Sequence, residues 1–172
     1  MRAPLFKDRP TLRQPRGAPI RRVLVILAPT EADVRSVRTL WRALRPLGVA
    51  VEAASECHGE VRGECREYLL PNLLLIDAIR RDWDAVVVAG GRGALRVAED
   101  RLAREVVALA AQRGKPIAAL GIGRCLLERG DVRGFVFDTG ETLSRWLLDR
   151  LDLQNAGTWP TSRTLPVTRP GT

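Results

Sequence analysis

The sequence has only one histidine and three cysteines in 172 residues. The cysteines, Cys57, Cys65 and Cys125, are odd in number and do not follow the spacing of metal ligands. Zinc sites are assembled from several cysteine and histidine side chains, so no metal is expected, and no cofactor motif is recognisable. This sparse cysteine content also favours a reducing compartment, and we predict a cytoplasmic protein.

Long apolar runs are also missing. None approaches the roughly 18 to 20 residues that a membrane span needs, so we expect no membrane association. Residues 1–20 contain charge and proline but no apolar centre of a secretory signal. The length predicts one domain with a proper core, which we place at residues 21–153.

The net charge of +8 is concentrated at the ends of the chain. Residues 1–22 sum to +6 and residues 154–172 to +2, whereas residues 23–153 hold 19 basic and 19 acidic residues and sum to zero. A basic tail binds phosphate weakly, but a solvated tail explains this pattern better. We therefore predict no specific nucleic-acid binding, and disordered or loosely packed tails at 1–20 and 154–172.

Apolar runs alternate with helical patterns along the chain. Buried strands are predicted at 21–29, 49–55, 84–91 and 116–121, and a short hairpin at 60–70. Helices are predicted after Thr30, whose spacing to Asp33 resembles a capping box, and at 93–112, 123–129 and 141–153, and a short helix is predicted after Pro71 within 71–83. This order predicts an α/β fold, a three-layer sandwich with a mostly parallel sheet. The pattern does not decide whether residues 131–140 form a strand.

Two of the helices have recognisable apolar faces. The first carries Val34, Val37, Trp41 and Leu44 on one face and is expected to end at Gly48. The helix at 93–112 is expected to turn Leu95, Ala98, Leu102, Val106 and Leu109 inward.

A ligand crevice is expected beyond the carboxyl ends of the strands, where parallel sheets bind small molecules. Three such ends can be placed, at 28–33, 89–92 and 120–124. Arg92 and Arg124 stand at the mouth of this crevice, where they could hold a carboxylate or phosphate together with backbone amides or could simply be solvated. Gly-Arg-Gly at 91–93 lacks the third glycine of a dinucleotide fingerprint.

The stretches DAVVVAGG (84–91) and GKPIAALGIG (114–123), with the paired leucines and Glu128 that follow, resemble the ThiJ/PfpI family. Residues 60–78 are similar to the linking hairpin of that family. The family has a flavodoxin-like sandwich related to class I glutamine amidotransferases. The closest similarity is to the ThiJ/PfpI-like C-terminal domain of large-subunit catalases.

The resemblance implies a site with three parts. Active members have a cysteine on the turn from strand to helix, a glutamate at the end of the first strand, and backbone amides that bind an oxyanion. In this chain Gly121 stands at the cysteine position, and Glu31 or Asp33 is near the glutamate position. The oxyanion part of the site needs no side chain. The backbone amides of Gly90, Gly91, Ile122 and Gly123 could therefore still form it.

Two of the cysteines are candidates to replace the missing nucleophile. Cys125 lies four residues past the turn and is either a small core residue or a displaced nucleophile. Cys57-His58-Gly59 copies a family motif but follows the second strand, and adjacent residues rarely orient as nucleophile and base. A loop cysteine and a surface histidine are the better interpretation.

Three functions remain open. The first is a catalytically degenerate domain, a pseudoenzyme and homodimer, that binds a small anionic metabolite or a protein partner. The second is a glyoxalase-, deglycase- or amidohydrolase-type enzyme with Cys125 as nucleophile and Glu31 or Asp33 as acid and base. The third is a structural module that packs on a partner, as in large catalases. The missing nucleophile favours the first.

Overall fold

A computed structural model describes residues 20–153 and contains one six-stranded sheet in the order β5-β2-β1-β6-β7-β8. All of its pairs are parallel. Its strands are β1 (Arg22–Ile26), β2 (Ala50–Ser55), β5 (Leu73–Leu74), β6 (Ala85–Val88), β7 (Ile117–Leu120) and β8 (Phe135–Phe137). A separate antiparallel hairpin consists of β3 (Val61–Arg62) and β4 (Tyr68–Leu69). The predicted α/β fold with a mostly parallel sheet is confirmed.

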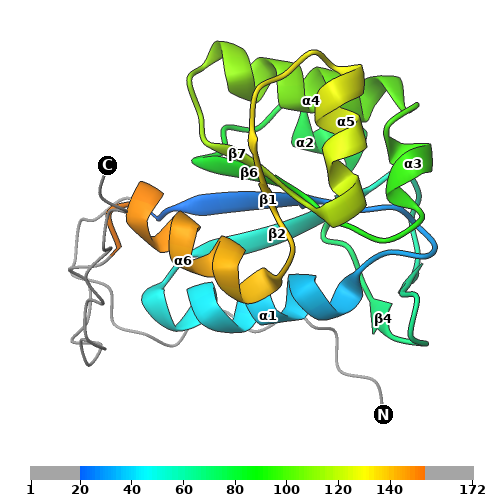
Figure 1. Ribbon diagram of the computed structural model, residues 1–172, viewed down its shortest axis with the longest axis horizontal. Helices are drawn as coiled ribbons and strands as arrows, with labels where there is room; N and C mark the ends of the chain where they lie inside the picture. Colours follow the sequence, from blue (N-terminus) through cyan, green and yellow to red (C-terminus); the bar gives the residue numbers. More distant parts are fainter. Residues whose placement is uncertain (1–19, 154–172) are drawn as a thin grey trace, which may run out of the picture.

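Helices cover both faces of the sheet (Figure 1). One layer holds α1 (Val34–Leu44), which a short 3-10 turn η1 (Arg45–Leu47) extends, and α6 (Gly140–Arg150). The other layer holds α2 (Leu75–Ala78), α3 (Ala94–Val97), α4 (Arg101–Gln112) and α5 (Arg124–Arg129), with η2 (Gly121–Gly123) leading into α5. No helix in residues 20–153 has the length and hydropathy to cross a membrane.

The central strands are continuous apolar runs because each of their faces supports a hydrophobic core. In β1, Val23 and Val25 join the core under α1 and α6, whereas Leu24 and Ile26 join the core under α2 to α5. All four side chains are fully buried. Alternate side chains of a strand point to opposite faces of the sheet. In a strand between two helix layers, every side chain is therefore buried and is expected to be apolar.

The first helix follows the predicted face, but its cap differs. Val34, Val37, Leu40 and Leu44 are buried and Trp41 is partly buried, and Gly48 ends the segment with a φ of 75°. The N-cap is Asp33, whose carboxylate accepts the Ser36 N–H at 3.1 Å. The expectation of a cap at Thr30 was therefore wrong, because the chain enters the helix three residues later.

The helix predicted at 93–112 is two helices. α3 ends after Val97, and Asp100 starts α4 by accepting the Ala103 N–H at 2.8 Å. An aspartate at this place stabilises a helix start more than a helix interior, which explains the break. Leu95, expected inward, is 55% exposed, because α3 turns it away from the sheet.

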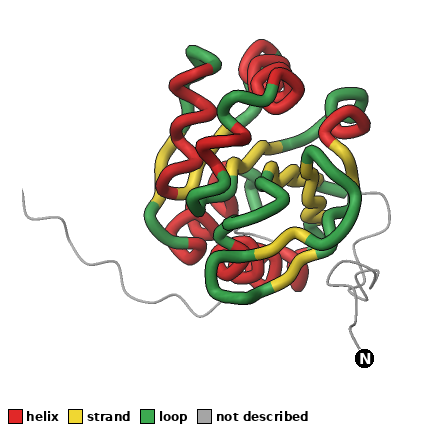
Figure 2. Tube along the Cα trace, turned by 90° about the vertical axis from the view of Figure 1, so that its right-hand side faces the viewer, coloured by secondary structure: helices red, strands yellow, loops and turns green. Residues whose placement is uncertain are grey.

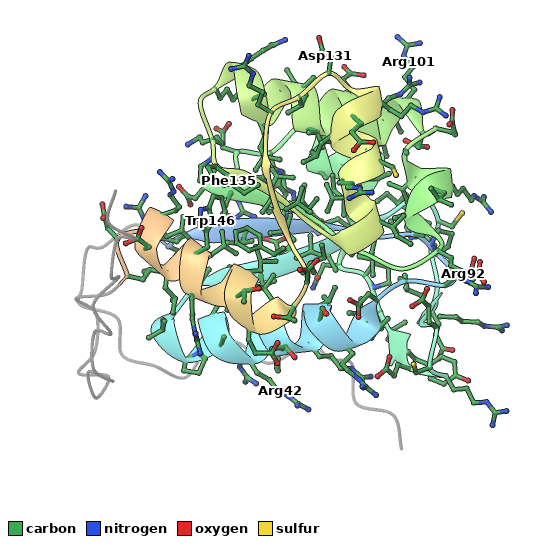
Figure 3. All side chains as sticks on the ribbon, viewed as in Figure 1. Arg42, Arg92, Arg101, Asp131, Phe135 and Trp146 are labelled. Atoms are coloured by element: carbon green, nitrogen blue, oxygen red, sulfur yellow. The ribbon has the colours of Figure 1, made fainter. Side chains whose placement is uncertain are left out.

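Residues 131–140, left undecided by the sequence, contain the edge strand β8. Its Phe135 and Phe137 rings lie 4.9 and 5.4 Å from the Trp146 ring of α6, centroid to centroid. Figure 3 shows Phe135 and Trp146 close together. These contacts attach the edge strand to the helix layer. The predicted tails at 1–20 and 154–172 lie outside the described residues, except for Ile20.

Candidate functional site

The candidate site is at the carboxyl edge of the sheet, where the loops after β1, β6 and β7 meet. These loops, α3 and the β3–β4 hairpin lie at the right-hand end of Figure 1, and Figure 2 looks onto that end. The loops after β1 and β6 are joined by backbone hydrogen bonds: the Asp33 N–H donates to the Gly90 carbonyl at 3.0 Å, and the Gly93 N–H to the Glu31 carbonyl at 3.1 Å.

Two glycines allow this close approach. Gly91 has a φ of 91°, and a Cβ there would overlap the Glu31 carbonyl oxygen and lie 2.7 Å from the Asp33 nitrogen. A Cβ at Gly93 would overlap the Thr30 carbonyl oxygen. Both positions exclude a side chain by backbone contact. The Gly-Arg-Gly segment is thus explained by loop packing.

The turn after β7 has the strand-to-helix geometry that the sequence predicts. Gly121 directly follows β7 with a φ of 48°, is exposed, and has no atom within 4 Å of the place where a Cβ would stand. By contrast, a Cβ at Gly123 would lie 2.7 Å from the Ala89 carbonyl oxygen, and one at Gly90 would lie 2.8 Å from that of Leu120. The structure therefore brings the two glycine turns together and leaves open space only in front of Gly121.

A backbone donor and two arginines belong to the same edge of the sheet. The N–H of Ile122 is in the first turn of a short helix, where no preceding carbonyl of the helix can accept it. Ile122 itself is 41% exposed. Arg124 is exposed, and its Nε lies 3.7 Å from Glu128 Oε1 of the same helix. Arg92 is also exposed, and Figure 3 places it at the outer rim of this edge.

The two carboxylates suggested for the acid position are placed differently. Asp33 caps α1 through Oδ1. Glu31 has a φ of 54° and an exposed side chain, while its carbonyl is bound by the Gly93 N–H. Asp33 therefore has a structural partner, and the Glu31 side chain is directed by a strained backbone into solvent.

Cys125 is half-buried on α5 and packs against the hydrophobic core that α2 to α5 form on their face of the sheet. A thiol in such a place fills space like a small apolar side chain. The other two cysteines, Cys57 and Cys65, are exposed, and His58 is exposed beside Cys57. All three thiols are free.

Sequence reasoning missed one carboxylate at this edge. Glu64, at the tip of the β3–β4 hairpin, accepts the Arg92 N–H through Oε1 at 2.8 Å. The hairpin is held over the loop after β1 by the Ala32 N–H to Arg62 carbonyl and Glu64 N–H to Ala32 carbonyl bonds, each 3.2 Å. The amide after the paired glycines therefore already binds an anionic group. No local sequence signal could have shown this, because it depends on long-range pairing.

Two polar atoms at the end of β2 were also missed. The Ser55 hydroxyl is fully buried, and neither it nor Glu56 Oε1 has a protein partner in the described part of the chain. The other carboxylate oxygen of Glu56 accepts from Arg96 of α3 at 3.2 Å. Buried polar atoms of this kind are normally satisfied by water or a ligand. Residues 20–153 contain no group of histidine, cysteine and acidic side chains that could hold a metal.

Comparison with solved structures shows the same fold in several organisms. DJ-1beta of Drosophila melanogaster is 27% identical with a TM-score of 0.61; the match covers 66% of this chain and 61% of that protein. An oxidized DJ-1 of Toxoplasma gondii is 18% identical with a TM-score of 0.66, covering 78% of this chain and 91% of the other. A two-domain protein of Anabaena variabilis, with DJ-1/ThiJ/PfpI-like and ferritin-like domains, is 17% identical with a TM-score of 0.71, covering 84% and 52%.

The chain thus spans about three fifths of the Drosophila protein's length. No curated protein matches the sequence. The model of the DJ-1/PfpI family matches residues 21–144, from the start of β1 into α6. The ThiJ/PfpI resemblance predicted from the glycine turns is confirmed at the level of the family. The chain belongs to the DJ-1/PfpI family.

Proposed function

We propose that this protein is a catalytically degenerate member of its family that binds a small anionic ligand at the turn after β7. The observation that carries this proposal is Gly121. It has the φ of 48° expected of the strained turn and open space at its Cα, but no side chain to act as nucleophile. A covalent mechanism at this position has no attacking atom.

A ligand in this space would meet backbone donors and positive charge. The amides of Ile122 and Gly123 lie on the turn, and the Arg124 side chain is at its end. Carboxylate or phosphate oxygens accept such hydrogen bonds strongly. The Arg92 amide, in contrast, is bound to Glu64, so a ligand reaching that amide would compete with a carboxylate of the chain itself.

The alternative enzyme needs Cys125 as nucleophile. Its packing against the core opposes that role, because the side chain would have to leave an apolar contact to reach a substrate in front of Gly121. We therefore prefer binding to catalysis. The suggested acids, Glu31 and Asp33, have no nucleophile to serve at this turn.

The proposal is tested by titrating inorganic phosphate and acetate into the full chain and following backbone amide shifts. We expect saturable changes at Ile122 and Gly123, and weaker binding in Arg124→Gln. Arg129→Gln is the matched control, because Arg129 is an exposed arginine at the other end of α5 that pairs with Glu99 at 2.8 Å. Binding that is equally weakened by both variants, or shifts confined to other regions, would contradict the proposal.

A second candidate, a homodimer or a module that packs on a protein partner as the catalase-like resemblance suggests, rests on the sheet edge. Phe135 and Val136 of β8 are 50% and 47% exposed, and edge strands with apolar side chains readily pair with another chain. Sedimentation of the wild type and of Val136→Arg tests it. A dimer that the substitution dissociates would support it, and a monomer at all concentrations, or a dimer that the substitution leaves intact, would contradict a dimer through this edge.

A further inference from the structure

A carboxylate of the chain itself occupies one backbone donor at the candidate site. Glu64 Oε1 accepts the Arg92 N–H at 2.8 Å, although the two residues are 28 positions apart in the sequence. A hydrogen bond from an amide to a carboxylate is charge-assisted and is stronger than one between neutral groups. This donor is therefore closed to a ligand as long as the Glu64 side chain stays in place.

The contact lies at the same edge of the sheet as the turn after β7. Because β6 and β7 are parallel neighbours, the loops that follow them, which contain Arg92 and Gly121, leave the sheet side by side. Their backbones are in close contact, since a Cβ on Gly90 would lie 2.8 Å from the Leu120 carbonyl oxygen. A negatively charged ligand at this edge therefore meets a carboxylate of the chain as well as the backbone donors.

The hairpin that carries Glu64 is anchored by its backbone and by its apolar side chains. Val61 and Leu69, one from each of its strands, are 1% exposed and join the core under α1 and α6. The Ala32 N–H donates to the Arg62 carbonyl and the Glu64 N–H donates to the Ala32 carbonyl, both at 3.2 Å. Figure 1 shows the hairpin beside the start of α1. The backbone of Glu64 is thus fixed independently of its side chain.

The Glu64 side chain, by contrast, is held by the Arg92 bond alone. The residue is exposed, and within the described part of the chain its carboxylate has no ion pair and no other hydrogen bond. Glu67 of the same hairpin differs, because its Oε1 lies 3.6 Å from the Arg35 Nε. An exposed glutamate changes rotamer without moving the backbone. The Glu64 carboxylate can therefore exchange with a ligand carboxylate while the hairpin stays attached.

We propose that Glu64 is an internal competitor that keeps the Arg92 amide closed and sets how tightly this edge binds small carboxylates. The inference rests on the proposed function in taking the ligand to be an anion. A ligand carboxylate must displace a group of its own chemical kind, which is attached to the chain and therefore present at high effective concentration. The wild type binds a monocarboxylate weakly for this reason, and removal of the Glu64 carboxylate adds the Arg92 amide to the donors of the site.

The experiment titrates acetate into the full chain and follows the backbone amide shifts of Arg92 and Ile122. In Glu64→Ala we expect a saturable Arg92 shift with a dissociation constant at least about tenfold lower than in the wild type, because no charge-assisted bond has to be broken first. Glu64→Gln keeps an oxygen acceptor without the charge and should give an intermediate value. Glu67→Gln removes the same charge from the same hairpin, but Glu67 pairs with Arg35, so this control should behave like the wild type.

Hydrogen exchange of the Ala32 amide separates competition from a structural role of Glu64. This amide donates to the Arg62 carbonyl and reports whether the hairpin stays attached. Its exchange rate should be the same in the wild type, Glu64→Gln and Glu64→Ala. Faster exchange in both variants would contradict the proposal, because Glu64 would then support the hairpin rather than compete for an amide.

Three results of the titration would overturn the proposal. These are equal acetate affinity of the wild type and Glu64→Ala, an Arg92 amide that does not respond to acetate in Glu64→Ala, and a gain in affinity that Glu67→Gln reproduces. The Ile122 amide tests the proposed function separately. An Arg92 response in Glu64→Ala without any shift at Ile122 would count against binding at the turn after β7 and would support the competition by Glu64.

Discussion

Replacing three glycines by alanine tests whether the turn after β7 has room for a side chain. Gly91, Gly114 and Gly121 all have positive φ, at 91°, 65° and 48°. A left-handed conformation costs a residue with a Cβ about 1–2 kcal/mol. Gly114 and Gly121 have no atom within 4 Å of the added carbon, so alanine should cost only this amount at either position.

Gly91→Ala adds a steric cost to the conformational one. Its Cβ would overlap the Glu31 carbonyl oxygen and lie 2.8 Å from the Ala32 carbonyl carbon. Overpacking of a closed site costs about 1–3 kcal/mol, which gives a total of about 2–5 kcal/mol. For a chain of this size, each kcal/mol lowers the melting temperature by about 2–4 °C.

Urea unfolding gives the free energies of unfolding of the three variants, and these can be compared directly if the dependence on urea concentration, the m-value, is the same for all three. We expect Gly121→Ala to match Gly114→Ala and both to be clearly more stable than Gly91→Ala. If Gly121→Ala were as damaging as Gly91→Ala, the space in front of Gly121 would be occupied, and the reasoning about the site would fail.

Three further predictions concern the supports of the site and the cores. Asp33→Ala should lower the free energy of unfolding by about 1 kcal/mol through loss of the α1 cap, and Asp33→Asn by less, as urea titration can show. Glu64→Ala should increase the hydrogen-exchange rate of the Arg92 amide, which loses its acceptor, and an unchanged rate would mean that the hairpin does not cover it. Leu143→Ala, in the core under α1 and α6, should cost about 2–5 kcal/mol, whereas Leu95→Ala should change the melting temperature little.

The parts of the fold that the sequence predicts are those with strong local patterns. The runs at 21–29, 84–91 and 116–121 contain uninterrupted buried apolar segments, at 23–28, 85–89 and 117–120, and this continuity is required of strands between two helix layers. The break between α3 and α4 was not predicted, because residues 93–112 have apolar side chains at helical spacing on both sides of Asp100. Only the packing decides whether such an aspartate caps a helix or sits within one.

The parts of the candidate site that consist of backbone turns could be predicted from the sequence. The parts that depend on contacts between distant segments could not. Gly121 and Gly123 stand on a turn that the glycine spacing marks, and the structure places both there. Glu64 reaches the Arg92 amide only because the hairpin docks on the loop after β1.

The account's central claim is that the turn at Gly121 binds without covalent catalysis. The most direct test is conversion of methylglyoxal to lactate without added cofactor, measured for the wild type and Cys125→Ala, with intact folding checked by circular dichroism. The account predicts that neither protein exceeds the rate without protein. Robust turnover by the wild type that Cys125→Ala abolishes would contradict it and would place a displaced nucleophile on α5.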